Sequence, residues 1–377
     1  MKYTKRAFSL LLAAILFAVT LAGCSMPKLV IGGTPKTVGT VGEHEVTSGE
    51  YLAYMYLAFT DAYFSQGLYQ YAQYGLDAWD QELTYGEGDN QQKIKLEELL
   101  RLSAQEMLVT QEAVRQLMQE NNIKWDEEDV KDLEESFASM KEEDFLAMGI
   151  SRETMINTYK NVSLNESSLL QGLYGKGGSR EVSEKDRKAY FDKNYLSYKT
   201  ISIELTDNEG KELAADKKKV QLDLLNGYLA DYNKSKNFET VMDAYTKYQA
   251  EQNKNENAED DKEEELKPST DKDNRINVDA TNLDENMAKA IRETELGKAR
   301  VVELKANGTT PTAALIVRLD PNDGDLFTDV TEAIISKMKS EELDKEIDER
   351  KKSITVNLKK SAIKKCDPKP FEEKVLG

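Results

Sequence analysis

The sequence predicts an α+β protein whose first part is mostly α-helical. Three observations support this prediction. Over residues 37–175, apolar side chains recur at helical spacing. Near residue 198 an alternating, strand-like segment appears and the pattern becomes mixed, and after about residue 323 a last long helical pattern follows. A length of 377 residues allows two or three domains, and 32% charged with 39% hydrophobic residues are typical of a soluble, helix-rich chain.

Composition excludes several kinds of chemistry. The chain has 51 Lys and Arg against 69 Asp and Glu, and its formal net charge of -18 disfavours a nucleic-acid partner held by phosphate contacts. Two cysteines and one histidine nearly exclude a zinc site, a Cys–His catalytic pair and a disulfide-stapled fold. The sequence has neither a P-loop nor a Gly-x-Gly-x-x-Gly fingerprint. We therefore predict no metal, no cofactor and no catalytic residue.

Residues 1–23 have the layout of a secretory signal peptide. Three basic residues, Lys2, Lys5 and Arg6, precede an uncharged apolar run over residues 7–20. The following Leu21-Ala22-Gly23-Cys24 resembles a bacterial lipobox, in which the cysteine is acylated and becomes the first mature residue. An uncleaved membrane helix is the alternative, but the run is shorter than the roughly 20 residues that span a bilayer. We therefore expect lipidation of Cys24 and anchoring to the outer face of the cell membrane.

Cleavage would change both the charge and the cysteine count. Removal of residues 1–23 takes away three positive charges and no acids, so the formal charge falls from -18 to -21. Residues 24–36 then form a short tether, which would hold an acidic body away from an anionic lipid surface. With Cys24 acylated, Cys366 has no partner for an intramolecular disulfide.

A helical domain is expected over residues 37–195. It begins with two strand-like pieces around a Gly turn within residues 37–46. Thr47 and Glu50 then have the spacing of a capping box that starts a helix. Further helices are expected over residues 96–118, 126–140, 151–173 and 184–194, the last three starting at the N-cap candidates Asp126, Ser151 and Ser183.

The aromatic-rich stretch from Tyr51 to Trp79 is the feature that suggests recognition. One interpretation is ordinary core and helix packing. The other is a cradle for unfolded segments, because aromatic side chains with polar tips bind extended chain at a low cost in side-chain entropy. The peptide-binding candidates are Tyr51, Tyr54, Phe59, Tyr63 and Phe64.

A smaller α+β domain is expected over residues 196–322. Its strands are expected over residues 198–205, 299–304 and 313–319, and its helices over residues 214–229, 238–248 and 284–294. Residues 251–275 hold ten acids and five bases with two apolar residues, so we expect a disordered acidic insertion, with cation binding as the alternative. Residues 323–377 supply the last long helix and a tail with a strand-like piece at 354–358.

Several stretches, read in order, resemble the PrsA and SurA family of extracytoplasmic foldases and chaperones. They are Val41 to Thr47, Leu108 to Ala113, Asn122 to Val130, Phe145-Leu146 with Gly149 to Ser151, Val182 to Asp186, and Tyr190-Phe191. Each motif by itself is weak, and the opening lacks the family's Asn, but together they cover nearly the whole mature chain. The resemblance implies a helical, SurA N-terminal-like chaperone domain, built from the N- and C-terminal segments and interrupted by a parvulin-type prolyl isomerase domain.

The isomerase part departs from the family at its catalytic positions. Family members carry a histidine on the first strand, where this chain offers Thr200, Ile201 or Ser202, and another on the last strand, where it has residues 314–317, Ala-Leu-Ile-Val. We therefore expect a retained fold with an inactive site. Prolyl isomerisation breaks no covalent bond, so an active isomerase with an altered site stays open. His44, the single histidine, is expected to be a surface turn residue and not a general base.

The resemblance implies a membrane-anchored chaperone or foldase that binds exported, incompletely folded polypeptides. The alternatives are an active peptidyl-prolyl isomerase and a non-catalytic assembly partner in the envelope. An exposed apolar groove on the helical domain would favour the chaperone, and a closed, uniformly charged surface would favour the assembly partner. The clients, and the choice between a monomer and a homodimer, stay open.

Overall fold

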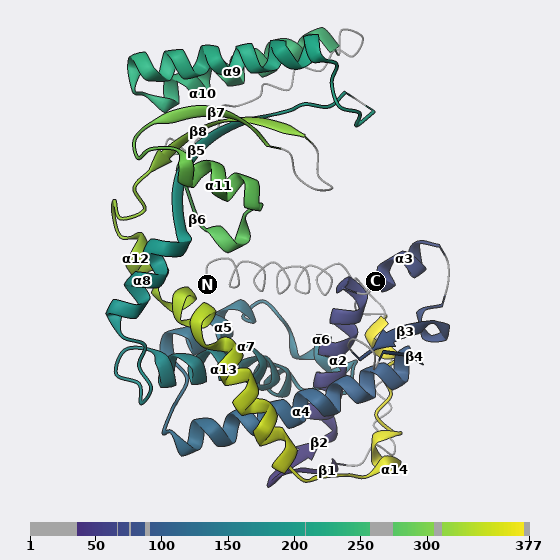
Figure 1. Ribbon diagram of the computed structural model, residues 1–377. Coiled ribbons are helices and arrows are strands. Elements are labelled where there is room, and N and C mark those ends of the chain that lie inside the picture. The colour runs from purple at the N-terminus through teal and green to yellow at the C-terminus, as the bar shows by residue number, and fades with distance from the viewer. Residues whose placement is uncertain are drawn as a thin grey trace. The chain divides into compact units, whose positions relative to one another are not determined.

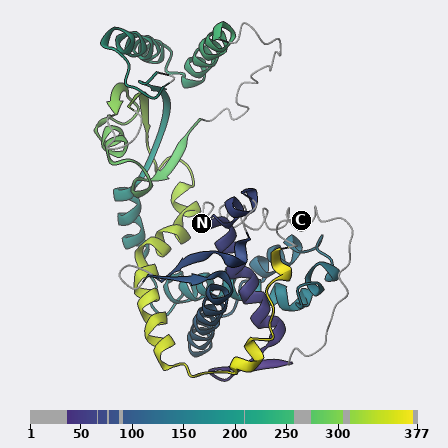
Figure 2. The ribbon, with the colours of Figure 1, turned by 90° about the vertical axis from the view of Figure 1, so that its right-hand side faces the viewer.

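The computed structural model describes residues 36–65, 67–74, 77–86, 91–207, 209–256, 274–304 and 311–372. These residues have a mixed α+β fold that is mostly helical, with small antiparallel sheets (Figure 1, Figure 2). Contacts divide the chain into two units: unit 1 comprises residues 1–182 and 335–377, and unit 2 comprises residues 183–334. The predicted signal peptide, Cys24 and nearly all of the tether lie outside the described residues.

Unit 1 is a helical body that carries two small sheets. Its elements are β1 (Thr37–Val41), β2 (His44–Thr47), α2 (Ser48–Ser65), α3 (Leu68–Gln73), η1 (Ala78–Asp80), β3 (Glu82–Tyr85), β4 (Gln92–Lys95), α4 (Leu96–Glu120), α5 (Glu127–Ser136), α6 (Glu142–Leu146), α7 (Arg152–Tyr174), most of α13 (Thr331–Ser353), β9 (Val356–Leu358) and α14 (Lys360–Ile363). The order β2-β1-β9 makes one antiparallel sheet, and β3-β4 is a hairpin. Unit 1 is therefore assembled from both ends of the chain.

Ion pairs and apolar packing join the two ends in unit 1. Arg350 on α13 donates to both carboxylate oxygens of Glu120 on α4, at 2.5 and 2.7 Å. Arg180, after α7, makes the same paired contact with Glu346 on α13. Under these contacts, Ile335, Leu343 and Ile347 of α13 pack against buried residues of α4 and α7. The burial of this apolar face supplies most of the stabilisation, because ion pairs at the surface contribute little.

Unit 2 is a four-stranded antiparallel sheet with helices on both faces. Its elements are α8 (Glu184–Asn194), β5 (Tyr195–Glu204), α9 (Ala215–Ser235), α10 (Phe238–Glu256), β6 (Ile276–Asp279), η3 (Ala280–Asn282), α11 (Glu285–Glu293), β7 (Ala299–Leu304), β8 (Thr312–Leu319) and α12 (Leu326–Asp329). The strand order is β6-β5-β8-β7. Ile201, Leu315 and Val317 face α9 and α10, whereas Tyr198 and Ile316 face α11, as the period of two requires.

The predicted helix starts agree with the observed caps. Side chains of Asp126, Ser151 and Ser183 accept hydrogen bonds from backbone N–H groups in the first turns of α5, α7 and α8. Thr47 accepts from the N–H of Glu50 at 3.1 Å, as in a capping box. The Glu50 carboxylate, however, contacts the ring of His44. Local cap chemistry thus located these ends correctly.

The unit boundaries differ from the expected domain boundaries of 37–195, 196–322 and 323–377. Unit 2 includes α8 and α12, which the sequence had assigned to the helical domain. The reason is packing: the ring of Phe191 on α8 stacks on Tyr195 of β5 at 5.1 Å and meets Phe327 of α12 edge-on at 5.4 Å. Burial of Phe191 in this cluster fixes both helices to the sheet.

Several element predictions were wrong in extent or missed an element. The helix expected over 126–140 ends at Ser136, and α9 continues to Ser235. The helix α10 continues to Glu256, so residues 251–256 of the expected disordered insertion are helical, while residues 257–273 lie outside the described residues. The hairpin β3-β4 and the strand β6 were not predicted. Only Leu83 and Ile94 are buried in β3 and β4, so the apolar alternation is too short to recognise.

Candidate functional site: an aromatic surface beside the C-terminal segment

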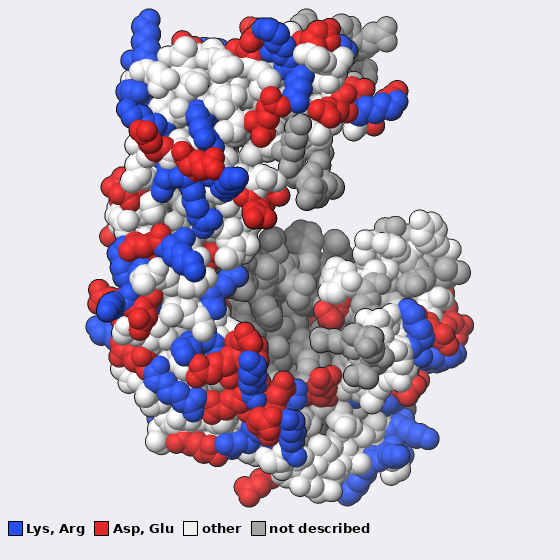
Figure 3. All heavy atoms as spheres, in the orientation of Figure 1, with Lys and Arg blue, Asp and Glu red and all other residues white. Residues whose placement is uncertain are grey.

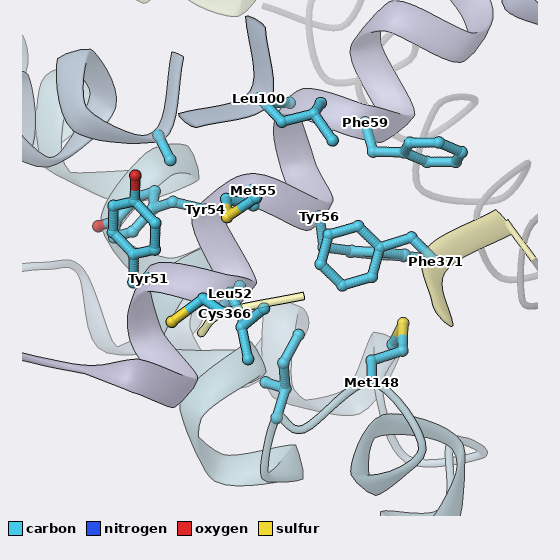
Figure 4. Close-up of a cluster of buried hydrophobic side chains, with 14 of the residues drawn as sticks. Tyr51, Leu52, Tyr54, Met55, Tyr56, Phe59, Leu100, Met148, Cys366 and Phe371 are labelled. Carbon is cyan, nitrogen blue, oxygen red and sulfur yellow. The ribbon is translucent and has the colours of Figure 1, made fainter. Parts of the chain in front are cut away.

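The peptide-binding candidates on α2 divide into a buried and an exposed group. Tyr51, Tyr54 and Phe59 are each 1% exposed and belong to the core of unit 1 (Figure 4). In this structure the alternative interpretation as core packing describes them, and peptide contact by these three residues stays a prediction. Burial raises the pKa of Tyr51 to about 12, and its hydroxyl donates to the carbonyl of Arg101 at 3.1 Å.

The other two candidates lie at the C-terminal end of α2 and are accessible. Phe64 is 37% exposed, and Tyr63 is partly buried against the core. The Tyr63 ring meets Phe64 edge-on at 5.0 Å and Tyr69 of α3 at 6.2 Å, and Tyr69 is 38% exposed. We call Tyr63, Phe64 and Tyr69 the aromatic surface. Tyr74, just after α3, is 78% exposed.

The neighbourhood of this surface is poor in charge. Figure 3 shows mostly uncharged side chains among the described atoms over α3 and the adjoining end of α2, whereas charges of both signs cover α13. Partial burial raises the pKa of Tyr63 above its ordinary value of 10.0 and so further disfavours the charged phenolate. Uncharged rings with hydroxyl tips can contact apolar side chains and donate hydrogen bonds to backbone carbonyls.

The aromatic surface continues into the core through a series of ring contacts. Phe59 stacks on Tyr63 at 6.3 Å and on Trp79 of η1 at 5.9 Å. Phe371, near the C-terminus, then meets Phe59 at 6.1 Å and Tyr56 at 5.5 Å, both edge-on. Figure 4 shows Phe371 entering this cluster from a segment that is separate from α2. A terminal segment thus fills the inner end of an aromatic path that reaches the surface.

Side chains of unit 1 also hold the backbone of the residues before Phe371. The guanidinium of Arg101 on α4 donates to the carbonyl of Ile363 at 2.5 Å and to the carbonyl of Cys366 at 3.2 Å. Beyond Phe371, the indole N–H of Trp79 donates to the carboxylate of Glu372 at 2.6 Å. We call residues 366–372 the tail segment. Sequence analysis missed Arg101, Phe371 and Glu372; the available signal was an isolated Pro-Phe-Glu after a charged stretch.

His44 lies at the start of β2 with its side chain 42% exposed. Its Nε2 is 2.9 and 3.0 Å from the two carboxylate oxygens of Glu50. The hydrogen bond to Glu50 raises the pKa of His44, burial opposes the shift, and nearby Glu112 adds to it while Arg115 reduces it. The arrangement is an ion pair between β2 and α2.

His44 should therefore titrate above its ordinary pKa of 6.5. The pairing stabilises unit 1 fully below pH 6.5 and is lost as pH rises through the higher folded pKa, because the neutral ring no longer attracts Glu50. An NMR titration of this single histidine measures the pKa directly. Glu50→Gln should lower it toward 6.5, while Glu45→Gln, an exposed change on the same strand, should leave it nearly unchanged. Equal pKa values in wild type and Glu50→Gln would contradict the assignment.

The strand positions where the resemblance expects histidines are adjacent in unit 2. Thr200 of β5 pairs with Ile316 of β8, and Ser202 pairs with Ala314, all on the face toward α11. Thr200 Oγ1 is buried and has no hydrogen-bond partner among the described residues. Ile316 and Ala314 are fully buried and apolar. These four side chains offer no general base.

The described residues offer no further site for a metal ion, a membrane span or a disulfide. Within the described ranges, no cluster of three or more His, Cys, Asp or Glu side chains could hold a metal ion. Among the helices of the same ranges, none has the length and apolarity to cross a membrane. Cys366 is a buried free thiol whose pKa burial raises, and Cys24 lies outside the described residues.

Among solved structures, the chain is similar to that of a foldase. No protein-family model matches the chain, and no curated protein matches it. The crystal structure of foldase protein PrsA from Streptococcus pneumoniae str. Canada MDR_19A is similar over 78% of this chain and 99% of that chain, with 13% sequence identity and a TM-score of 0.35. Since this score is low, we base the following proposals on this chain's own residues.

Proposed function

We propose that this protein is a chaperone or foldase that holds incompletely folded polypeptides on unit 1. The observation that carries the proposal is the aromatic surface of Tyr63, Phe64 and Tyr69, which continues inward through Phe59 to the ring of Phe371 in the tail segment. Exposed aromatic side chains in contact with one another are typical of surfaces that bind other chains. No nucleotide is needed, because binding to the unfolded state shifts a client's folding equilibrium by mass action.

The cellular setting of the proposal comes from the sequence. The lipobox-like residues 21–24 support a lipid anchor on Cys24 at the outer face of the membrane, and exported polypeptides would be the clients there. Unit 2 would serve as a scaffold, since Thr200, Ser202, Ala314 and Ile316 supply no proton-transfer group where the family carries histidines. A homodimer is compatible with this proposal and is not required by it.

The test is refolding of a reporter protein whose slow phase is prolyl isomerisation, with a soluble form of residues 25–377. We expect aggregation to be suppressed near a one-to-one ratio and the slow phase to keep its rate. Acceleration at substoichiometric amounts would instead make the protein an isomerase. No effect on aggregation or rate would favour an assembly partner and reject the chaperone proposal.

A double variant, Tyr63→Ser with Phe64→Ser, should weaken client binding about tenfold, measured as the concentration for half suppression of aggregation. The estimate assumes that two interface aromatics together contribute about 1.4 kcal/mol. The matched control is Val220→Ser with Leu296→Ser, two exposed apolar residues of unit 2 at 61% and 52%. Equal losses in both double variants would show nonspecific apolar binding in place of a defined surface.

A further inference from the structure

The tail segment is bound to unit 1 in the way that a peptide ligand is bound. Three kinds of contact hold it, and each comes from a different element. Arg101 on α4 donates to the Cys366 carbonyl, Tyr56 and Phe59 on α2 contact the ring of Phe371, and the Trp79 indole on η1 donates to the Glu372 carboxylate. These contacts are a hydrogen bond to a backbone carbonyl, packing of rings around an aromatic side chain, and a hydrogen bond to a carboxylate. Peptide-binding sites combine the same three kinds of contact.

The tail segment is attached through these side chains and through packing, because Cys366 and Phe371 belong to the buried core of unit 1. Phe371 is fully buried, Pro368 is buried, and Lys369 between them is exposed. The Phe371 N–H bonds to the carbonyl of Pro368 within the segment itself. The last strand before it, β9, is paired with β1 only over residues 356–358. The segment can therefore leave without breaking the pairing of β1 with β2, but its departure undoes the helical turn at residues 370–372 and exposes the buried Cys366 and Phe371.

We propose that the tail segment occupies, in cis, the inner end of the client-binding surface, and that this surface selects segments that turn as the tail does, with a proline, an aromatic anchor and a following acid. The inference rests on the proposed function and names its client class. Phe59 contacts both Phe371 and Tyr63 of the aromatic surface, so a client that displaces the tail gains a continuous row of rings. The carboxylate preference follows from the Trp79 indole N–H, which can only donate.

A tethered occupant reduces the apparent affinity of a free peptide. Its effective concentration is on the order of millimolar for a short connection, so a tail segment with an intrinsic dissociation constant near 0.1 mM would weaken the binding of any competing peptide about tenfold. Clients with several such segments would overcome this competition more readily than single ones. The tail would thus keep the aromatic pocket out of water until a client arrives.

The experiment uses a fluorescein-labelled peptide of residues 364–377 with Ser in place of Cys366, and fluorescence polarisation with residues 25–377. Phe371→Ala empties the pocket and should bind the probe about tenfold more tightly than wild type. Glu372→Ala removes only the Trp79 contact and should give a gain of about threefold, which keeps the test valid if Phe371→Ala does not fold. Lys369→Ala, an exposed change in the same segment, is the matched control and should equal wild type. A probe with Ala in place of Phe371 should lose binding to every variant.

The outcomes separate this inference from the proposed function. If folded Phe371→Ala and Glu372→Ala bind the probe no better than wild type, the tail is an ordinary structural segment and the inference is overturned. Suppression of aggregation by the wild type would in that case leave the chaperone proposal intact. If the variants bind the probe more tightly than wild type but no form of the protein suppresses aggregation, the inference about the tail segment is supported. The chaperone proposal then fails.

Discussion

Gly39→Ala should destabilise unit 1 by at least about 3 kcal/mol and release β9 from the sheet. Gly39 has a φ of +142°, and a Cβ there would lie 2.1 Å from the carbonyl oxygen of Asn357 and 2.9 Å from the Cα of Leu358. Both atoms are backbone, so no side chain can move aside to make room. The strand β9 must shift away from β1, and with it the chain that leads to the tail segment.

Tryptophan fluorescence in denaturant measures this effect on unit 1 alone, since Trp79 and Trp125 are the two tryptophans of the chain and both lie in unit 1. The control is Gly177→Ala, also at positive φ (+82°) in unit 1 but with no atom within 4 Å of the added Cβ. It should cost about 1–2 kcal/mol from backbone strain alone. Hydrogen exchange should also be faster across β9 in Gly39→Ala. Equal free energies of unfolding for the two variants would contradict the close approach of β1 and β9.

Phe59→Ala should reduce the free energy of unfolding of unit 1 by about 3–5 kcal/mol. Phe59 is 1% exposed, and its ring contacts Tyr63, Trp79 and Phe371, so the truncation leaves a cavity where three aromatic side chains meet. The matched variant is Phe64→Ala on the same helix. Phe64 is 37% exposed, and we expect its loss to cost about 1 kcal/mol or less.

The two variants should differ in which property they change, client binding or stability. In conditions where both proteins are folded, Phe64→Ala should weaken suppression of client aggregation, because it removes a ring that a client contacts. Phe59→Ala should mainly lower the denaturant midpoint of the tryptophan signal. If Phe64→Ala were the more destabilising of the two, the assignment of the core and surface positions of α2 would be wrong. If it left client binding unchanged, the aromatic surface would not be the client site.

The sequence predicted most helices of this protein because their ends are set locally. Asp126, Ser151 and Ser183 accept first-turn N–H groups that would otherwise be unsatisfied, and this requirement involves only neighbouring residues. The strand β7 was predicted at its observed bounds, residues 299–304, and β8 to within one residue. The mixed α+β class followed from these elements.

The division of α2 into core and surface could not be predicted from its spacing. All six residues from Tyr51 to Tyr56 are buried, so the first turns of the helix are covered on every side and have no polar face to set a direction. Only toward Tyr63 and Phe64 does one side of the helix reach solvent. A helical period reports which residues share a face, but not how many neighbouring elements cover the helix.

The sequence by itself determined the acidic composition, the single histidine, the lipobox-like start and the positions of most helices, since each depends on residue type or on contacts a few residues apart. The tertiary structure alone decided that α8 and α12 join the sheet of unit 2, and that Phe371 lies beside Phe59, 312 positions earlier in the chain. The reason is that burial of a side chain depends on which distant segments cover it. No local pattern in the sequence specifies those partners.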